Sequence, residues 1–438
     1  MSNTSTIHIK TDFDCKVYDY GQELGTTKAD TYFNIELRKG EHELTFVFMG
    51  DESISKTKNY IVEKVDCDYK LVVNIVEELC KKAKEYFDSE NYSVAYNLLK
   101  AAADKGLVIA EYYLGLCYIN GYAVNKDINE AINWFTKAAN QGNAEAQWQL
   151  ALYYYDPWDG FTDTSVYWIE KAALLGHAKA QYEMGHFFEF GNHVEKDLIK
   201  AMKWYSKASK QGDSRAYYRL GLCYEKGNGV ERCYDKAINY YIKASELGNE
   251  QAQMHLAFCY GKGEIVDKDT FKKMHWYTEA AIQGNAEAQY ALCLDYLEPE
   301  LKVQNSDRNY NNFIEWFIEL EKNQRSEGHY YYSMVFKRII DLKDSNLFCL
   351  IGYHYDLYAD EPDYQKAFDW YSKAAEIGSA DAEYELGSYY EKGIIVEKDI
   401  EKAIGWYMKA IGHGYQEKGY VPNQEKGGYE EALRRLNV

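Results

Sequence analysis

The stretch AEYYLGLCYINGYAVNKDINEAINWFTKAANQG, residues 110–142, decides the fold, because variants of it return along the chain. The recurring pattern is Ala-x-x-x-Leu-Gly, an aromatic residue, a turn, Trp-aromatic-x-Lys-Ala and a closing glycine. The closing glycines are Gly106, Gly142, Gly176, Gly212, Gly248, Gly284, Gly378 and Gly414. Neighbours up to Gly284 are 36, 34, 36, 36 and 36 residues apart, and the last two are 36 apart. This period predicts a solenoid of stacked units, which presents a long surface to another macromolecule.

The first half of each copy predicts a helix that packs closely on its partner. Ala110, Leu114 and Tyr118 are spaced i, i+4 and i+8, which places them on one apolar stripe. Gly115 removes a side chain at the point where a second helix has to approach.

The second half predicts the partner helix. Asp127 can cap its start, and Ala131, Trp134 and Ala138 form the stripe that faces the first helix. Gly142 then ends the helix in a left-handed conformation.

These phrases resemble the Sel-one-like repeat, a relative of the tetratricopeptide repeat. Close copies begin at Ala180 and Ala382, and the resemblance covers most of residues 73–414. It implies a right-handed α/α superhelix that binds proteins or peptides.

The period breaks once, between two blocks of repeats at 73–297 and 346–414. Trp276 and Trp316 are 40 residues apart, and Trp316 and Trp370 are 54 apart, which is one repeat plus 18. We therefore predict an irregular insertion at 298–345 with an extra helix near 330–341, after a long loop at 298–307.

Both ends of the chain differ from the repeats. Residues 1–70 alternate apolar and polar side chains in short runs, which predicts a small antiparallel β-sandwich with a hairpin connection at 38–41. The layout resembles the PEGA domain, although the prolines typical of its turns are absent. Residues 415–438 are predicted to form a cap or tail. The fold class is therefore α+β by domain, a TPR-like solenoid preceded by the sandwich.

Composition limits the partners and the compartment. The formal charge of −19 argues against nucleic acid and anionic membranes, and a basic protein or peptide fits better. An N-terminus without a signal-peptide pattern, no bilayer-length apolar run and an odd count of nine cysteines favour a soluble cytoplasmic protein with free thiols. Cys117, Cys223 and Cys259 share one repeat position, which predicts a packing role.

Sites of catalysis are not evident in the sequence. It contains no nucleophile elbow, phosphate-binding Walker loop, HExxH motif or paired CxxC motif, so we predict no catalytic residue, metal ligand or cofactor. Glycine pairs such as Gly227 and Gly229 recur at the turn between helices, where a structural role explains them.

The strongest candidate site is a surface. In the tetratricopeptide arrangement, the residues two and six positions after the first-helix alanine face the concave groove. The predicted partner-binding residues are Tyr112, Trp148, Tyr182, Tyr218, Met254, Phe258, Tyr290 and Tyr384. An aromatic groove suits an extended segment or a helix. The same tyrosines can instead pack against the neighbouring repeat, and both interpretations stay open.

The leading hypothesis is a non-enzymatic scaffold or adaptor that binds a protein or peptide in this groove. One alternative is a cell-wall or β-lactam-related hydrolase, since some secreted, cysteine-rich members of the family are associated with that chemistry. The repeated cysteine pairs and export signal of those members are absent here. The other alternative is a carbohydrate-binding platform, since Tyr and Trp faces stack on sugars.

Overall fold

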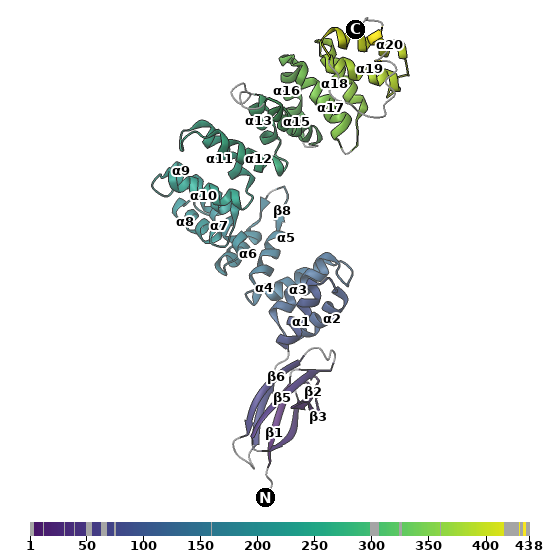
Figure 1. Ribbon diagram of the computed structural model, residues 1–438. Coiled ribbons are helices and arrows are strands. Elements are labelled where there is room, and N and C mark those ends of the chain that lie inside the picture. The colour runs from purple at the N-terminus through teal and green to yellow at the C-terminus, as the bar shows by residue number, and fades with distance from the viewer. Residues whose placement is uncertain are drawn as a thin grey trace. The chain divides into compact units, whose positions relative to one another are not determined.

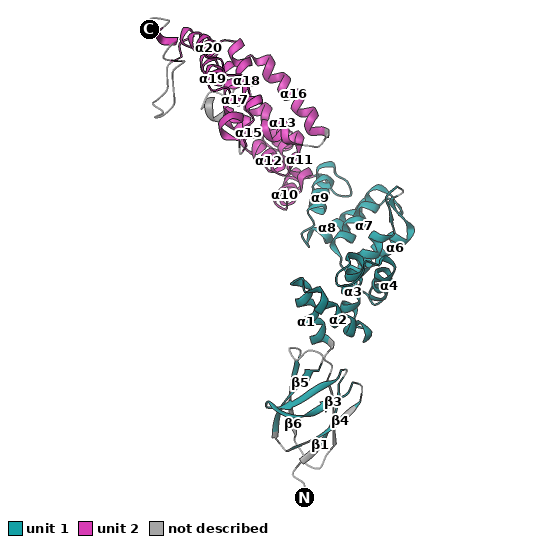
Figure 2. Ribbon diagram, turned by 90° about the vertical axis from the view of Figure 1, so that its right-hand side faces the viewer, with its two compact units in different colours: residues 1–232 teal, residues 233–438 magenta. Residues whose placement is uncertain are grey.

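The computed structural model is predominantly helical, with a small β region at its N-terminus (Figure 1). It describes residues 4–11, 13–29, 31–38, 40–49, 55–62, 68–73, 76–158, 160–297, 306–323, 326–359, 361–415, 429 and 432–434. The chain divides into two compact units, 1–232 and 233–438 (Figure 2). The predicted domain boundaries near 70, 297, 345 and 414 stay predictions.

The N-terminal region contains two sheets. Strands β4, β1 and β7 form one, and β3, β2, β5 and β6 form the other. Ile7 lies opposite Ile35 in the first sheet, Val17 lies opposite Phe46 in the second, and all four side chains are buried in one core. The strands are β1 Thr4–Thr11, β2 Cys15–Asp19, β3 Gln22–Thr27, β4 Tyr32–Arg38, β5 Gly40–Phe48, β6 Ser55–Val62 and β7 Asp68–Val73.

Two details of this region differ from the sequence prediction. The small antiparallel β region is confirmed, but β1 and β7 pair in parallel. The hairpin predicted at 38–41 is wrong, because β4 pairs with β1 while β5 pairs with β2 and β6. The chain passes from one sheet to the other there, and a short polar connection alone does not distinguish these two cases.

Antiparallel helix pairs follow, as the period predicts. The helices of unit 1 are α1 Val76–Asp88, α2 Tyr92–Asp104, α3 Val108–Asn120, α4 Ile128–Asn140, α5 Ala144–Tyr153, α6 Asp163–Leu174, α7 Ala178–Phe190, α8 Leu198–Ser209 and α9 Ser214–Lys226. In the described residues of unit 2 the helices are α10 Tyr234–Glu246, α11 Glu250–Lys262, α12 Thr270–Ile282, α13 Ala286–Leu297, α15 Ser306–Lys322, α16 Ser326–Leu342, α17 Ser345–Tyr353, α18 Tyr364–Glu376, α19 Ala380–Lys392 and α20 Ile400–Gly412, with a π-helix η1 at His354–Tyr358. A two-residue strand pair, β8 Tyr155–Asp156 and β9 Gly160–Phe161, joins α5 to α6.

Helix ends follow the predicted chemistry. The Asp127 side chain accepts a hydrogen bond from the backbone N–H of Glu130 at 3.1 Å, and Asp197, Asp269 and Asp399 cap α8, α12 and α20 in the same way. Gly142 has a φ of 87°, the left-handed conformation expected after a helix.

A glycine on the first helix fixes how closely the second helix approaches. A Cβ at Gly115 would lie 2.5 Å from the Phe135 ring, and one at Gly185 would lie 2.6 Å from the Tyr205 ring. Gly352 and Gly387 meet Tyr371 and Tyr407 in the same way. The buried ring of the second helix therefore rests directly on the backbone of the first.

The aromatic residue at the centre of each helix pair is the one after the tryptophan. Phe135 is buried, whereas Trp134 is half-buried, with the Lys137 ammonium 3.7 Å from the centre of its ring. The sequence analysis placed Trp134 in the facing stripe, and it lies at the edge of that stripe. A helical step of 100° separates the two residues, and the glycine decides which one faces inward.

Helix α16 interrupts the alternation of first and second helices. It covers the run YYYSMVFKRIID and packs on both α13 and α15. Val335 and Ile339 are fully buried, in one core with Phe317, Phe348 and Trp370. The long loop predicted at 298–307 lies largely outside the described residues.

Candidate binding surface

The predicted groove residues lie on the first helices of their repeats, next to a fully buried alanine. Most of their side chains are half-buried. Trp148 is buried, and Phe258 is the most open, with half of its surface exposed. The structure therefore places them in the predicted register without forming an open aromatic floor.

Contacts within the repeat explain part of this burial. The ring centres of Tyr112 and Phe135 are 5.9 Å apart, and those of Tyr384 and Tyr407 are 5.2 Å apart. In each pair the second ring is the one that rests on the glycine. One side of the predicted groove residue is therefore used in packing the helix pair.

Contacts with the following repeat cover a second side. Trp148 stacks on His177 with ring centres 5.0 Å apart, and the Arg215 guanidinium lies 4.0 Å from the ring centre of Tyr182. Arg215 also forms ion pairs with Asp213 at 2.9 Å and Glu183 at 3.4 Å. Trp148 and Tyr182 are thus part of the interface between neighbouring repeats, which agrees with the packing interpretation.

Two of the predicted residues are stacked against later parts of the chain. Tyr290 stacks on Tyr331 of α16 at 5.0 Å. Tyr384 stacks on Tyr415 at 4.4 Å and contacts the buried Tyr429 edge-on at 5.4 Å. Met254 packs in the core between α12 and α13.

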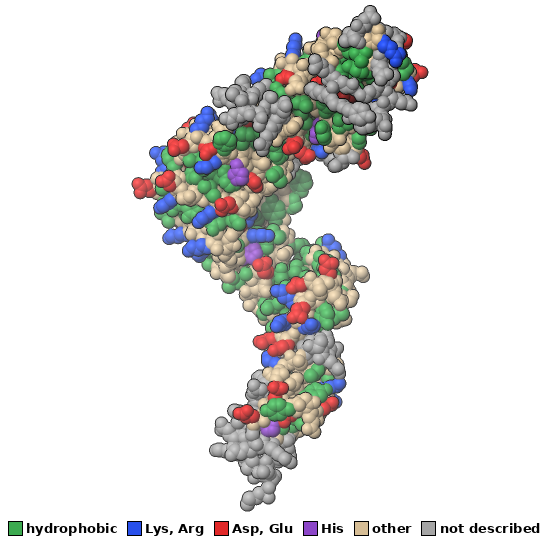
Figure 3. Space-filling view, in the orientation of Figure 1, with side chains coloured by type: hydrophobic (Ala, Val, Ile, Leu, Met, Phe, Trp, Pro, Cys, Tyr) green, Lys and Arg blue, Asp and Glu red, His purple; other side chains and the backbone are tan. Residues whose placement is uncertain are grey.

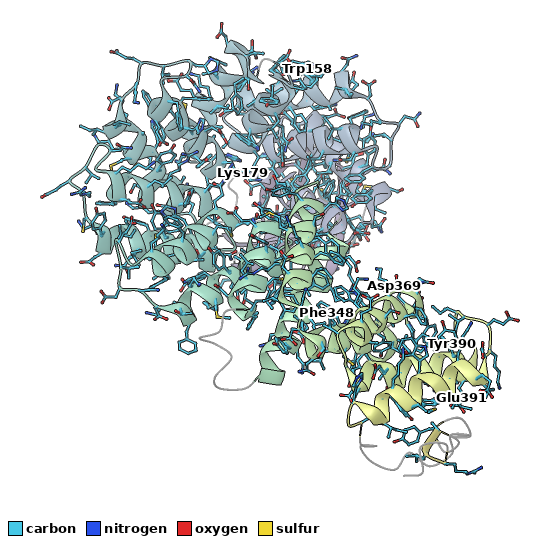
Figure 4. The ribbon with its side chains drawn as sticks, turned by 90° about the horizontal axis from the view of Figure 1, so that it is seen from above. Trp158, Lys179, Phe348, Asp369, Tyr390 and Glu391 are labelled. Atoms are coloured by element: carbon cyan, nitrogen blue, oxygen red, sulfur yellow. The ribbon has the colours of Figure 1, made fainter. Side chains whose placement is uncertain are left out.

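One predicted position opens onto a pocket. Trp148 and Leu152 line a cavity of about 670 Å³ between α5 and the turn that leads from α6 into α7. The rest of its wall consists of Ala144, Glu145, Gln149, Leu175, Gly176, His177, Ala178, Lys179 and Gln211. Figure 4 labels Lys179 of this wall, together with Trp158 at the edge of the repeats. Leu152 is half exposed, so an apolar contact is accessible there.

Trp158 was not singled out by the sequence analysis. It lies on the turn between β8 and β9 and is 94% exposed, and its backbone N–H donates to the Asp156 carboxylate at 2.7 Å. The signal that could have found it is the sequence DPWDG, which departs from the turn of every neighbouring repeat.

A buried polar ladder was also missed. The Gln147 side chain donates to the backbone carbonyl of Ala139 at 2.9 Å, joining a first helix to the second helix of the preceding repeat. Gln181, Gln253 and Gln289 form the same bond with Ala173, Ser245 and Ala281. Glu111 and Glu383 occupy this position in two other repeats and accept from Gln141 and His413. The recurring pair Ala-Glu or Ala-Gln was its visible signal.

Metal-ligand groups and cysteine thiols are two kinds of possible reactive site. Within them, no three His, Cys, Asp or Glu side chains are grouped to hold a metal ion. Cys117, Cys223 and Cys259 are buried, and burial raises the pKa of the Cys117 thiol to about 11 and that of Cys223 to about 12. These thiols are poor nucleophiles near neutral pH.

Charge on the helical repeats is mixed. On the face shown in Figure 3, acidic and basic side chains are interspersed over the helices. Burial raises the pKa of Glu183, and the nearby Arg215 opposes that shift. Of the described helices, none is long and apolar enough to cross a membrane.

Comparisons with known proteins agree with this geometry. A family model described as Sel1 repeat matches residues 82–107, 108–143, 144–177, 178–213, 214–249, 250–285, 349–379 and 380–415. The crystal structure of a protective antigen of uropathogenic Escherichia coli strains, which displays an SLR fold, is 29% identical, covers 76% of each chain and has a TM-score of 0.52. A Sel1 repeat protein from Oxalobacter formigenes is 32% identical, covers 57% of this chain and 98% of its own, and has a TM-score of 0.49.

A sel1-like repeat-containing protein of Acanthamoeba polyphaga mimivirus is 37% identical over 65 residues, which are 13% of this chain and only 11% of the viral protein. The family matches begin at residue 82, so the resemblance of residues 1–70 to a PEGA domain stays a prediction. The matches leave out 286–348, the interval that contains α16. Because they cover more than half of the chain with one register, the chain belongs to the Sel1 repeat family.

Proposed function

We propose that this chain is a non-enzymatic protein-interaction scaffold, and that a segment of its partner docks in the Trp148 pocket. Sel1 repeat proteins commonly act as protein-interaction scaffolds. The observation that carries the proposal is the cavity of about 670 Å³ lined by Trp148 and Leu152. The wall is more polar than apolar, so the leucines supply its apolar contact and the surrounding polar groups can orient a bound segment.

The pocket walls define what fits. Leu152 and Leu175 offer exposed apolar surface, while Glu145 and Lys179 supply one charge of each sign at the wall. An apolar side chain of an extended segment fits between the two leucines. Its backbone then lies within reach of the polar side chains of Gln149 and Gln211.

The remaining predicted groove residues have smaller roles in this proposal. Tyr112, Tyr182, Tyr218, Met254, Tyr290 and Tyr384 contribute at most part of a ring or side chain, whereas Phe258 is open enough to add a second apolar contact. The carbohydrate alternative is not favoured, because Trp148, Tyr290 and Tyr384 already stack on side chains of this chain. No observation favours the hydrolase alternative.

The test uses peptides selected from a random display library against the full chain. The selected peptides are then measured against Leu152→Ser and against Leu247→Ser, a matched control that is equally exposed and lies outside the pocket. Fully burying a leucine contributes about 1.5–3 kcal/mol, and about half of Leu152 is still exposed in the free chain, so Leu152→Ser should weaken binding about three- to tenfold.

Hydrogen exchange locates the bound peptide independently. Protection is expected at the starts of α5 and α7. Equal affinities of the two serine variants, or protection confined to other helices, would exclude this pocket as the docking site.

A further inference from the structure

The insertion of α16 opens a cleft between α15 and α17. In the regular repeats each first helix packs broadly on the second helix before it, whereas α17 meets α15 over a small area. Two adjoining cavities of about 500 and 580 Å³ occupy the space that results. Both are lined by Glu315, His354 and Tyr358, so we treat them as one cleft and call it the α15–η1 cleft.

The π-helix forms one wall of this cleft. The first helix of the following repeat, α19, ends at the left-handed Gly393, but α17 continues into η1. This continuation places His354, Tyr355 and Tyr358 along the cavity. Short π-helical segments inside helices occur frequently at functional sites.

The opposite wall combines apolar and acidic side chains. Ile314 and Ile318 of α15 and Leu350 of α17 supply the apolar part. The charged lining consists of Glu315, Glu319, Glu321, Glu361 and Asp363 against Lys322 and Lys366. Five carboxylates against two ammonium groups leave the cleft acidic.

Internal ion pairs use only some of these carboxylates. The Lys366 ammonium lies 3.0 Å from Glu321 and 3.6 Å from Asp363, and Lys322 lies 3.3 Å from Glu319. Within the described part of the chain, Glu315 and Glu361 are left without an ion pair. Burial and the nearby Lys322 lower the pKa of His354, so the imidazole adds little positive charge near neutral pH.

We propose that the α15–η1 cleft binds an arginine or lysine side chain from a basic segment of a partner protein. The aliphatic part of such a side chain can lie against the half-buried Leu350, and its cation matches Glu315 and Glu361. The exposed ring of Tyr358 adds a surface on which a guanidinium can stack. This inference rests on the proposed scaffold role but uses residues of unit 2 alone, so it can fail independently of the Trp148 pocket.

The experiment measures binding of a short labelled Gly/Ser peptide that carries two arginines to the full chain. The variant Glu315→Gln/Glu361→Gln removes both unpaired carboxylates, and both positions are exposed, so folding should be retained. The control Glu376→Gln/Glu397→Gln removes the same charge from exposed positions of unit 2 outside the cleft. Tyr358→Ala tests the stacking surface separately.

We expect the first variant to weaken binding about tenfold, Tyr358→Ala to weaken it about threefold, and the control to leave it unchanged. A peptide with glutamates in place of the arginines should not bind. If the first variant and the control lost the same affinity for the arginine peptide, the net charge of the chain rather than the cleft would explain binding. That result would overturn the proposal. The absence of measurable binding, or equally tight binding of free spermidine, would also overturn it.

Discussion

The regular repeats at 108–285 and the irregular segment at 306–358 both consist of helices with buried aromatic and apolar side chains, but the helices pack differently in the two regions. In the regular part, the predicted groove aromatics are partly covered by the next repeat, as Trp148 is by His177. In the irregular segment, α16 packs on both helices of the preceding pair, and α17 is left with little contact to α15.

This difference shows where surface becomes available for binding. A regular stack buries its recurrent side chains because each unit is shaped to fit its neighbour. Because the extra helix α16 packs on α13 and α15, α17 has little contact with α15. The cleft lined by Glu315 and Tyr358 lies between α15 and η1. A break in a repeat is therefore a second place to look for an open cavity, beside the Trp148 pocket of the regular part.

The largest effect should come from the core of α16. Ile339 is fully buried among Phe317, Phe348 and Trp370, so Ile339→Ala should lower the free energy of unfolding by about 3 kcal/mol. Met334→Ala, on an exposed face of the same helix, should cost less than about 1 kcal/mol. Urea unfolding of the full chain measures both. If the two variants lost the same stability, α16 would not be part of the solenoid core, and the comparison would fail.

A smaller effect tests what the two regions share. Gly185→Ala and Gly352→Ala would each push a Cβ to about 2.5 Å from a buried tyrosine ring, at a cost of about 2 kcal/mol for overpacking. Gly405→Ala is the control, because no atom lies within 4 Å of its Cβ position and a helical alanine should stabilise by up to about 1 kcal/mol. Unfolding midpoints that fell for Gly185→Ala but not for Gly352→Ala would show that the break also loosens the helix pair.

Much of the fold could be predicted from the sequence, because the residues that pack one helix on the next recur at the same positions in successive repeats. The period, the caps such as Asp127 and the close approach at Gly115 were all visible. The choice between Trp134 and Phe135 was not, since adjacent residues on a helix differ by 100° and only the opposing glycine decides.

The candidate sites were less predictable. The cover over Tyr290 comes from Tyr331 of α16, and the cover over Tyr384 comes from Tyr415, the last position of the same repeat, and from Tyr429 beyond it. The α15–η1 cleft depends on a π-helix, for which the sequence HYDLY carries no recognised signal. Each of these contacts joins residues at different positions of the repeat and occurs only once in the described residues. A repeated sequence pattern therefore gives no sign of it.

The last prediction concerns one glutamate position that occurs in both regions. Glu183 of the regular part is paired with Arg215. Glu385, which follows the break, accepts a hydrogen bond from Tyr353 at 3.3 Å, and burial together with the Asp356 carboxylate raises its pKa to about 7. Its folded-state pKa is thus above the ordinary value near 4.5, so the folded chain holds a proton that the unfolded chain has released between these two pH values.

Stability should therefore fall as pH rises from about 4.5 to about 7 and level off above, because the native state binds more protons in that window. Glu385→Gln removes this titration, so its melting temperature should decline less than that of the wild type between about pH 5 and pH 7. Glu376→Gln, an exposed change on α18, should keep the wild-type slope. If the melting temperatures of the wild type and Glu385→Gln changed equally with pH, the Glu385 carboxyl group would not be the source of the pH dependence. Glu385 would then be stabilised in its charged form as Glu183 is by Arg215, and the break would make no difference at this position.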